Sequence, residues 1–394
     1  MKAWVIAKKE LRDMFRDKRV VNGAFVMPVV MIIMFIMLIG FVEQSLTTKP
    51  DLSIGVPTGT NNIIIEAFEK SKVAKIIRIK DEAEGLAKMK NGDLRLVLGF
   101  SPDFEQGMES GKADVTAHYL DGEPLSQIAM ASVQKVIDET NKAKVKVLLQ
   151  AKGVSPELAD PIKLESKDAS GKDGLAGSAV VRLLPYLIVL WAFYGGFSIV
   201  SDLVAGEKER GTMETLLISP VRRRDIAFGK FISLAVVCLT SSLSSLVAVI
   251  ILGSLNLEMT KTMFPTGMHV SVISVVGMFV VLVPLVAFFA SSMIAVSAYA
   301  RNLREAQTYL TLFSFLVIMP AVFSQFIGLT GSEKATWVQW TPILNSAVAL
   351  KDALDSNLKA PVLIGTIVTS TVLAAIGWWI SAKLFEREQI VTRV

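Results

Sequence analysis

Residues 20–42 read VVNGAFVMPVVMIIMFIMLIGFV and contain no Asp, Glu, Lys or Arg. An α-helix needs about 20 mostly apolar residues to cross a bilayer, so this stretch predicts a membrane span. It is too long for the core of a cleavable signal peptide, and it follows a charged segment. Five further runs of the same kind come later in the chain, at residues 179–205, 226–255, 270–298, 308–329 and 361–384.

The composition of the chain agrees with six spans. Hydrophobic residues make up 52% of the 394 residues, charged residues make up 20%, and the mean hydropathy is +0.51. These values exclude an ordinary soluble protein. The expected fold class is therefore an α-helical polytopic membrane protein with six transmembrane helices.

Charged residues are distributed unevenly along the chain. Residues 43–178 carry 18 Lys and Arg against 21 Asp and Glu, whereas the rest of the chain carries 23 against 15. The balanced segment predicts a soluble extracytoplasmic domain inserted between helices 1 and 2. The chain has a single cysteine, Cys238, in an apolar run, so no disulfide within the chain can stabilise this domain.

Basic residues in the short segments predict the orientation in the membrane. They form four groups: Lys2, Lys8, Lys9, Arg12, Arg16, Lys18 and Arg19; Lys208, Arg210, Arg222, Arg223, Arg224 and Lys230; Arg301 and Arg304; Lys383, Arg387 and Arg393. All four groups fall on one side of a six-span chain, and that side is expected to be cytoplasmic. The chain is then a multi-pass protein of the cell inner (plasma) membrane, and both of its termini are cytoplasmic. Because this rule accounts for the basic excess, we expect membrane lipid and no nucleic acid as a partner.

The extracytoplasmic segment alternates short apolar runs with helical patterns. The expected strands are residues 52–56, 75–79, 94–100 and 115–120, and the expected helices are residues 61–70, 81–90, 102–110 and 124–151. This alternation favours an α/β domain in which helices cover a partly parallel sheet.

The first 19 residues predict an amphipathic helix. Trp4, Ala7, Leu11, Met14 and Phe15 recur at helical spacing with Lys and Arg between them. Such a helix would lie among the lipid headgroups before the chain enters the first span. The alternative is a charged tail without a special role.

The segment after the second span has the most informative pattern in the chain. Residues 207–220 read EKERGTMETLLISP. Met213, Leu216 and Leu217 share one helical face, and Pro220 follows the end of this short helix. An apolar stripe with exposed charges, just beneath the bilayer, is suited to docking in a groove on a partner. The alternative is a charged loop that serves only the topology.

This run resembles the cytoplasmic coupling segment of ABC-2-type transporter permeases. The family pattern is roughly Glu-x-Glu-x-Gly-Thr-x-Glu-x-Leu-Leu-x-(Ser/Thr)-Pro, and the chain matches it throughout. In this family the segment passes ATP-driven motion from a separate nucleotide-binding ATPase subunit to the spans. The residues to which the resemblance assigns this role are Glu207, Glu209, Arg210, Gly211, Thr212, Met213, Glu214, Leu216, Leu217 and Pro220. ATP and magnesium would then lie on the partner subunit, and this chain would bind no cofactor.

Other segments are similar to parts of the same family. Residues 1–19 resemble its interfacial elbow helix, with Trp4, Leu11 and Phe15 as the interfacial residues. The segment with Arg301, Arg304 and Glu305 resembles its second inner loop, and the segment with Trp340, Pro342 and Asn345 resembles its outer hairpin. A large soluble domain between the first two spans is similar to the NatB-like sodium exporter subgroup. The resemblance implies export, with sodium as a substrate, by a dimer of this chain or a pair with a paralogue.

The expected organisation follows from these segments. In chain order it comprises an amphipathic elbow helix (1–19), span 1 (20–42), the α/β domain (43–178), span 2 (179–205), the coupling segment (206–225), span 3 (226–255), span 4 (270–298), a cytoplasmic loop (299–307), span 5 (308–329), the outer hairpin (330–360), span 6 (361–384) and a cytoplasmic tail (385–394).

Enzyme chemistry has no plausible centre in the sequence. No Gly-x-x-x-x-Gly-Lys-(Ser/Thr) run occurs, so ATP hydrolysis must be supplied by another chain. His118 and His269 are the only histidines and stand far apart, and no Cys/His cluster exists, so no metal site is expected.

Polar residues within the spans have two interpretations. The candidates for lining a pathway are Ser241, Ser244, Ser291, Ser314 and Gln325. Small hydroxylated residues in membrane helices usually serve close packing, but they can also meet a cation in a weakly polar pathway. The spans show no central carboxylate, so sodium is suggested by the resemblance alone.

Several alternatives remain open from the sequence. The outer hairpin could be a re-entrant helix that gates the exit or a surface cap on the spans. The whole chain could instead be a membrane receptor with a ligand-sensing outer domain, although its inner segments are short and the coupling motif would have no purpose there. It could also be a secondary transporter, although the internal repeats and buried ionisable residues usual in that class are not evident. The exported substrate could also be a drug, a peptide or a lipid-like molecule.

Overall fold

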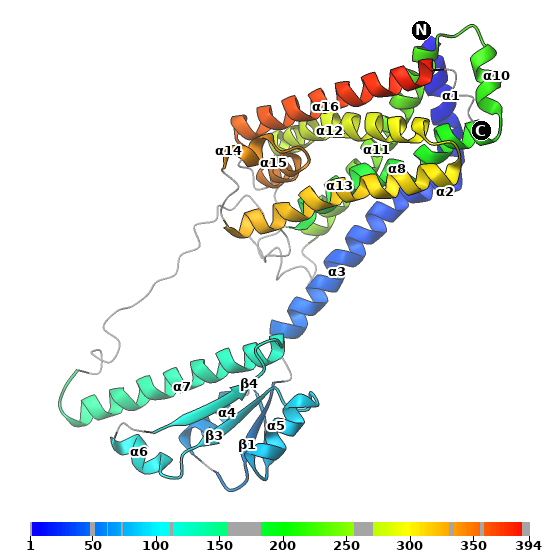
Figure 1. Cartoon of the computed structure of the whole chain (residues 1–394). Coiled ribbons are helices and arrows are strands. Elements are labelled where there is room, and N and C mark those ends of the chain that lie inside the picture. Colours follow the sequence, from blue (N-terminus) through cyan, green and yellow to red (C-terminus); the bar gives the residue numbers. More distant parts are fainter. Residues whose placement is uncertain are drawn as a thin grey trace. The chain divides into compact units, whose positions relative to one another are not determined.

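A computed structural model describes residues 2–47, 52–60, 62–71, 74–110, 113–155, 183–255, 271–330, 335–354 and 358–387. The chain divides into two compact units (Figure 1). One contains residues 1–40 and 169–394, and the other contains residues 41–168. We call them the membrane unit and the outer domain and describe each separately.

The membrane unit contains six helical segments long and apolar enough to cross a bilayer, among the described residues. They are Lys18–Phe41, Leu184–Glu209, Arg223–Ser254, Val272–Tyr299, Leu303–Ser324 and Ala360–Glu386. Together with the sheet domain between the first two, they confirm the fold class expected from the sequence.

Each span consists of one long helix or of a helix with short extensions. The elements in chain order are α1 (Lys2–Arg16), α2 (Lys18–Val21), the π-helix η1 (Asn22–Val26), α3 (Met27–Thr47), α8 (Leu184–Val200), the π-helix η4 (Ser201–Gly206), α9 (Glu207–Glu209), α10 (Thr212–Ile218), α11 (Arg223–Ser254), α12 (Val272–Tyr299), α13 (Leu303–Thr330), α14 (Thr336–Trp340), α15 (Leu344–Leu354) and α16 (Ala360–Glu386).

The fifth span begins earlier than its apolar run. We expected a loop over residues 299–307, but α13 begins at Leu303. Asn302 Oδ1 accepts a hydrogen bond from the backbone N–H of Glu305 (2.9 Å), and Glu305 Oε2 accepts one from the N–H of Arg301 (2.8 Å). Asn302 thus caps the first turn of α13, and Glu305 binds the chain just before it, so polar residues start the helix before its apolar part.

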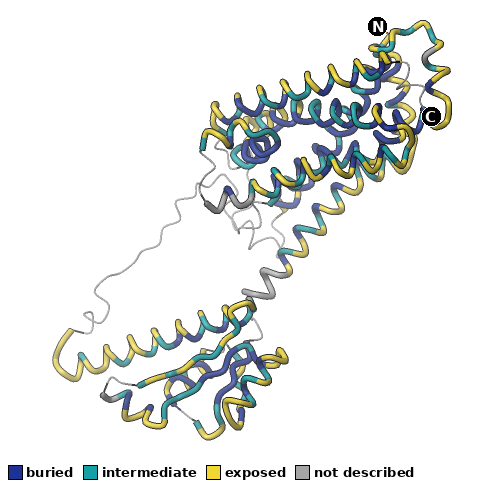
Figure 2. The backbone as a smooth tube through the Cα atoms, in the orientation of Figure 1, coloured by how far each residue is buried: buried dark blue, intermediate teal, exposed yellow. Residues whose placement is uncertain are grey.

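Helix α8 is the central helix of the membrane unit. In an apolar 18-residue stretch of its span 61% of the residues are buried, against 28% in the corresponding stretches of α3, α13 and α16; Figure 2 shows burial along the backbone. Small residues let α8 approach α11 closely: a Cβ added to Gly195 would lie 2.3 Å from Ser241 Cβ, and one added to Gly196 would lie 2.4 Å from Cys238 Sγ. Close contacts of small residues are the usual packing device of helices in lipid.

The outer domain contains a four-stranded sheet in the order β2-β1-β3-β4. The strands are β1 (Ser53–Pro57), β2 (Lys75–Ile79), β3 (Leu96–Phe100) and β4 (Val115–Tyr119). Strand β1 pairs in parallel with both β2 and β3, and β4 runs antiparallel to β3. The expectation of a partly parallel sheet is confirmed.

Helices cover both faces of this sheet. On one face α4 (Ile63–Ser71), α6 (Phe104–Ser110) and α7 (Pro124–Ala151) pack over a core formed by β1 and β3. On the other face α5 (Glu82–Lys90) packs over Ile79, Leu94 and Val97 through Met89. The domain therefore has a hydrophobic core of its own.

Candidate functional site

The segment that follows α8 makes a sharp turn at Gly211. After η4 and α9, Gly211 adopts φ +69°, a left-handed conformation that favours glycine because it has no Cβ. Its N–H donates to the carbonyl of Lys208 at 3.0 Å and closes the end of α9. Helix α10 then starts in a new direction, which explains why glycine stands at this point of the motif.

Helix α10 turns its apolar stripe toward the membrane unit. Met213 is 1% exposed and belongs to the core, and Leu216 is half-buried against it. Glu214 and Thr215 are exposed, and Ile218 is 85% exposed. The side chain of Leu217 lies outside the described residues. We expected the stripe of Met213, Leu216 and Leu217 to meet a partner, but Met213 is packed in the core of the membrane unit. We call the exposed residues Glu214, Thr215 and Ile218 the free face of α10.

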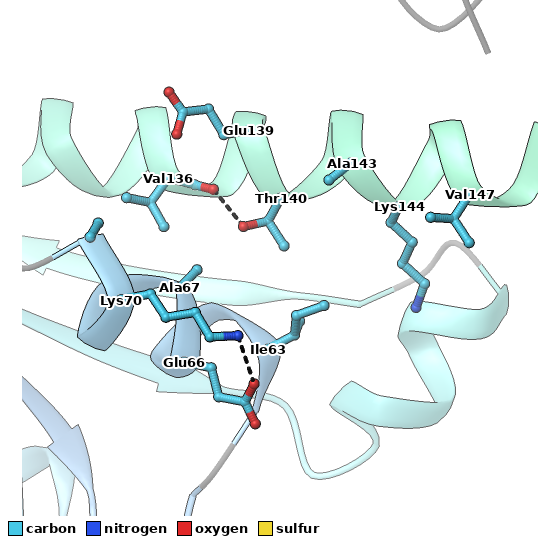
Figure 3. A pocket seen from close by; sticks show the side chains of 11 residues that line it. Ile63, Glu66, Ala67, Lys70, Val136, Glu139, Thr140, Ala143, Lys144 and Val147 are labelled. Carbon is cyan, nitrogen blue, oxygen red and sulfur yellow. Dashed lines mark hydrogen bonds and ion pairs between the residues drawn. The ribbon is translucent and has the colours of Figure 1, made fainter.

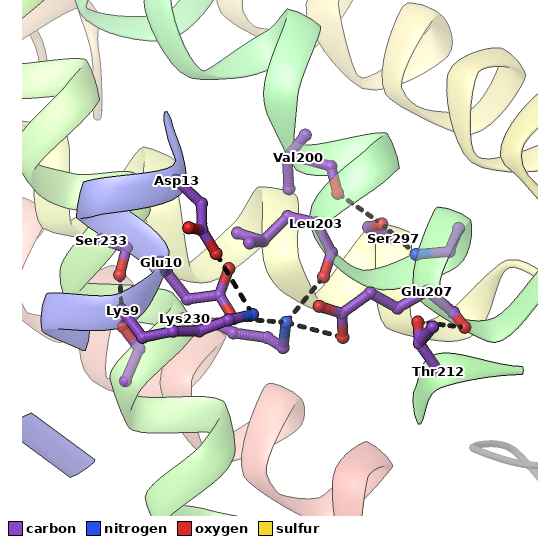
Figure 4. A network of polar contacts seen from close by, with 12 residues as sticks. Lys9, Glu10, Asp13, Val200, Leu203, Glu207, Thr212, Lys230, Ser233 and Ser297 are labelled. Carbon is purple, nitrogen blue, oxygen red and sulfur yellow. Dashed lines mark hydrogen bonds and ion pairs between the residues drawn. The ribbon is translucent and has the colours of Figure 1, made fainter. Parts of the chain in front are cut away.

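A buried cluster of charges lies next to this segment (Figure 4). Lys230 of α11 is fully buried, and its Nζ lies 2.8 Å from Glu207 Oε2 and 3.4 Å from Glu10 Oε1. The same ammonium donates a hydrogen bond to the carbonyl of Leu203 in η4 at 2.9 Å. One side chain thus joins α1, α11, η4 and α9.

The rim of this cluster is more polar and more exposed. Lys9 Nζ lies 3.2 Å from Glu10 Oε1 and 3.5 Å from Asp13 Oδ2. Partial burial lowers the pKa of Lys9, but the negative charges of Glu10, Glu207 and Asp13 raise it further, so the pKa lies above its ordinary value and the group stays charged. Arg210 and Asp202 form an exposed ion pair at 2.8 Å, which solvent screens.

The coupling segment is also tied to the turn between α12 and α13. Lys208 is 4% exposed, and its Nζ donates to the carbonyls of Ala298 and Ala300, the latter at 3.1 Å. Glu209 Oε2 accepts the N–H of Leu303 at 3.0 Å. The α9 residues therefore hold the start of α13, where Arg301 and Arg304 are exposed and Glu305 accepts from the Tyr309 hydroxyl at 2.7 Å.

Ser297 of α12 supports the π-helix that precedes the coupling segment. Its hydroxyl donates to the carbonyl of Val200 at 2.8 Å and accepts the N–H of Ala205 at 3.3 Å. Both backbone groups lie at the wide turn of η4, where the α-helical ladder is interrupted. A side chain of the neighbouring helix thus compensates for the irregular backbone.

Helix α1 packs against α11 through one face. Ile6, Ala7, Glu10 and Met14 are buried, and Gly229 permits a close crossing because an added Cβ would lie 2.7 Å from Ile6 Cβ. Of the predicted interfacial residues, Trp4 is 62% exposed, Phe15 is 40% exposed and Leu11 is half-buried. Lys2 Nζ donates to the carbonyl of Pro220 at 2.5 Å, which links this helix to the end of the coupling segment.

Three of the serines predicted to line a pathway form hydrogen bonds within their own helices. Ser244 donates to Thr240, Ser291 to Phe288 and Ser314 to Thr311, each to a carbonyl of its own helix, at 2.8, 3.0 and 2.7 Å. Ser241 is fully buried at the α8–α11 crossing, and its hydroxyl has no partner among the described residues. The side chain of Gln325 lies outside the described residues. A pathway role for these residues remains a prediction.

The outer hairpin enters the membrane unit. Helix α15 packs against α12, α8, α16 and α13, and Asn345 is fully buried. Asn345 Nδ2 donates to the carbonyl of Gln339 at 3.1 Å and to Thr369 Oγ1 at 2.7 Å. Ile343, which follows the half-buried Pro342, has φ +68°, a rare conformation for a β-branched residue, whereas Trp340 is 52% exposed. Helix α15 is thus packed among the spans, and the choice between a re-entrant helix and a surface cap stays a prediction.

Sequence reasoning missed the residues that hold the site together. Lys230 was counted among the basic residues that precede a span, and Glu10 was not singled out at all. A lysine four residues into an apolar run, and a glutamate on the apolar face of a helix, are the available signals, because an ionisable residue inside a span usually has a partner.

The chain is similar to known proteins over most of its length. A family model described as an ABC-2 family transporter protein matches residues 18–383. The ABC transporter permease protein NatB of Bacillus subtilis (strain 168) is 27% identical over 395 residues, which cover 98% of this chain and 98% of that protein. No solved structure matches the chain.

Proposed function

The chain belongs to the ABC-2 family of transporter proteins, as a multi-pass permease that is not itself an ATPase, and from this premise we propose that it moves a substrate with energy from a separate nucleotide-binding ATPase. The observation that carries the proposal is the free face of α10. Glu214, Thr215 and Ile218 are exposed, while on the opposite face Met213 is buried in the membrane unit and Leu216 is half-buried against it. A force applied to this face is transmitted directly to the spans.

Two sets of contacts would pass the motion of the coupling segment to the spans. Lys230 joins the coupling segment to α1 and α11, and Lys208 with Glu209 joins it to the turn before α13. Buried ion pairs resist separation, because a buried charge that loses its partner has no water to replace it. Displacement of α10 by an ATPase would therefore move several spans together.

The orientation follows from the position of the basic residues. Helix α1, the coupling segment and the end of α16 lie together, because Lys2 contacts Pro220 and Arg224 contacts Glu386 at 2.5 Å. We infer that this end is cytoplasmic by the positive-inside rule, so that both termini are inside. The ATPase would dock there, carrying its own ATP and magnesium.

The spans at the edge of the membrane unit support a second permease subunit. The spans of α3, α13 and α16 are only 28% buried, so their apolar faces meet lipid or another subunit. We infer a pair of permeases, either two copies of this chain or one copy with a paralogue. Sodium is the first substrate to test because of the resemblance to NatB-like exporters, with amphipathic drugs as the comparison.

The decisive experiment measures ATPase stimulation after the full chain and its ATPase subunit are reconstituted together in vesicles. Ile218→Asp introduces a charge on the free face of α10, and Glu214→Arg reverses one. Both variants are expected to weaken stimulation of the ATPase at least about tenfold. Val147→Asp is the control, because Val147 on α7 is 64% exposed and lies outside the six spans.

Full stimulation by both α10 variants would contradict docking at this face. Sodium and amphipathic drugs are compared in the same vesicles. If neither affects ATP hydrolysis or crosses the bilayer, sodium is no longer the favoured substrate.

A further inference from the structure

The outer domain contains a polar cavity of about 400 Å³. Gly59, Thr60 and Asn62, which follow β1, form one side, and Ser101, Pro102 and Asp103, which follow β3, form the other. Strands β1 and β3 are parallel neighbours, so their carboxyl ends meet at the same edge of the sheet. The cavity thus lies directly beyond this pair of strand ends.

This is the place where an open α/β sheet offers a binding crevice. From β1 the chain passes through α4 to β2 on one side, and from β3 it passes through α6 to β4 on the other side. Both helices lie on the same face of the sheet, and the cavity lies where the two connections diverge, beyond the ends of β1 and β3. Its walls are therefore the segments that follow these two strands and lead into α4 and α6.

Asn62 supplies an unused hydrogen-bond donor in this cavity. It is 8% exposed and lines the cavity, and its Oδ1 accepts the N–H of Ile65 at 3.1 Å in the first turn of α4. Its Nδ2 is buried and has no hydrogen-bond partner among the described residues. A buried amide donor without a partner is costly, so it indicates an acceptor supplied from outside the domain.

Positive and negative charges lie on opposite sides of the cavity. Near Thr60, the N-terminus of the nine-residue helix α4 offers partial positive charge, and the guanidinium of Arg78 bonds the Thr60 carbonyl. On the other side Asp103 and Glu105 are exposed carboxylates that line the cavity. A ligand with a carboxylate at one end and an ammonium at the other matches both sides.

We propose that this cavity binds a small zwitterion of the amino-acid or short-peptide class. The ligand carboxylate accepts from Asn62 Nδ2 at the start of α4, and its ammonium faces Asp103 and Glu105. The volume is large enough for an amino acid or a dipeptide. This gives the outer domain a ligand of its own and does not depend on how α10 couples to an ATPase.

A second hollow of the domain has different chemistry. It lies between α4 and α7 and is lined mainly by Ile63, Ala67, Val136 and Val147, with the ion pair of Glu66 and Lys70 at its edge (Figure 3). It offers no buried donor among the described residues that line it, and nothing in the structure indicates what covers it.

Calorimetric titration of the full chain in lipid nanodiscs, without an ATPase subunit, tests the proposal. The probes are L-alanine and alanyl-alanine, with acetate and methylammonium as the two halves of the ligand. L-alanine or the dipeptide is expected to bind at least about tenfold more tightly than either half, because both charged ends must be present together.

Asn62→Asp is the discriminating variant. It keeps the oxygen that caps α4, so the domain stays folded, but it replaces the Nδ2 donor by a charged acceptor that repels a carboxylate. Binding should weaken at least about tenfold. Gln134→Leu, on the exposed side of α7, is the control and should bind as the native chain does.

The outcomes separate this proposal from its rivals. Absence of binding by every probe overturns the proposal, and so does native affinity in Asn62→Asp. Stronger binding of methylammonium than of L-alanine would also overturn it, because the acidic side alone would then be the site. None of these results depends on ATPase stimulation, so failure here leaves the proposed function unchanged.

Discussion

The ammonium of Lys230 has no solvent around it and two carboxylates beside it, those of Glu10 and Glu207. Bringing charges out of water is expensive, and their mutual attraction offsets this only while every partner is present. The buried cluster is therefore sensitive to the loss of a single member. Its value to the protein lies in holding α1, α9 and α11 in one arrangement.

We predict that Lys230→Met destabilises the membrane unit by about 3–5 kcal/mol, because Glu207 loses its buried counter-charge and Glu10 keeps only Lys9, at 3.2 Å. Thermal unfolding of the purified chain in detergent measures this loss. The matched comparison adds Glu10→Gln and Glu207→Gln to Lys230→Met, which removes the unpaired charges and should recover part of the stability. Equal stability of the single variant and the native chain would contradict the cluster.

Gly211 offers a second prediction, because proline cannot adopt its φ of +69°. Gly211→Pro should lower ATPase-stimulated transport at least about fivefold while the chain still inserts into the membrane. Gly153→Pro is a close control: Gly153 has φ +71°, and its N–H likewise donates at 3.0 Å, to the carbonyl of Gln150 at the end of α7. Equal transport by the two variants would contradict a role of the turn at Gly211 in coupling.

Among the elements, α10 shows what a helical pattern can and cannot predict. The spacing of Met213 and Leu216 predicts a helix with an apolar stripe, and α10 (Thr212–Ile218) has one. The pattern does not tell which of two neighbours the stripe meets, a partner protein or the chain's own spans. That choice depends on the left-handed turn at Gly211 and on Lys208, which anchor α10 against the membrane unit.

The crossing of α1 and α11 gives a prediction at the same scale. A Cβ at Gly229 would lie 2.7 Å from Ile6 Cβ and 2.9 Å from the carbonyl oxygen of Ala3, so Gly229→Val must displace α1. We expect a loss of about 1–3 kcal/mol and faster proteolysis of α1. Gly23→Val is the control, because an added Cβ there meets only Ser198 Oγ at 3.7 Å. Similar proteolysis in both variants would argue against the close crossing.

On the scale of the whole molecule, the chain has two units with separate cores. The outer domain contains Leu96 and Leu98 in a core shared by β1, β3, α4 and α7, while α8 is central to the membrane unit. We predict that Leu96→Ala destabilises the outer domain by about 2–5 kcal/mol. Hydrogen exchange should accelerate in β1 and β3 and remain unchanged in α11. Acceleration in both units would mean that they unfold together.

The spans and the sheet could be predicted from the sequence because each rests on a local pattern. The strand expected at residues 75–79 is β2 (Lys75–Ile79), and the helix expected at residues 124–151 is α7 (Pro124–Ala151). The partners of Lys230 could not be predicted, because Glu10 lies 220 positions away and only the packing of α1 on α11 brings it close. The unused Nδ2 donor of Asn62 could not be predicted either, because it depends on how the first turn of α4 uses the Oδ1 of the same side chain.

The π-helix η4 (Ser201–Gly206) has a mechanical consequence. A π-turn holds one residue more than an α-turn, so converting η4 to α-helix would rotate everything after it by about 100° around the helix axis. The rotation exchanges one set of hydrogen bonds for another, and Ser297 already stands beside the groups that would change partner. Such a conversion would turn α9, which directly follows η4, by one residue around its axis and with it the start of the coupling segment.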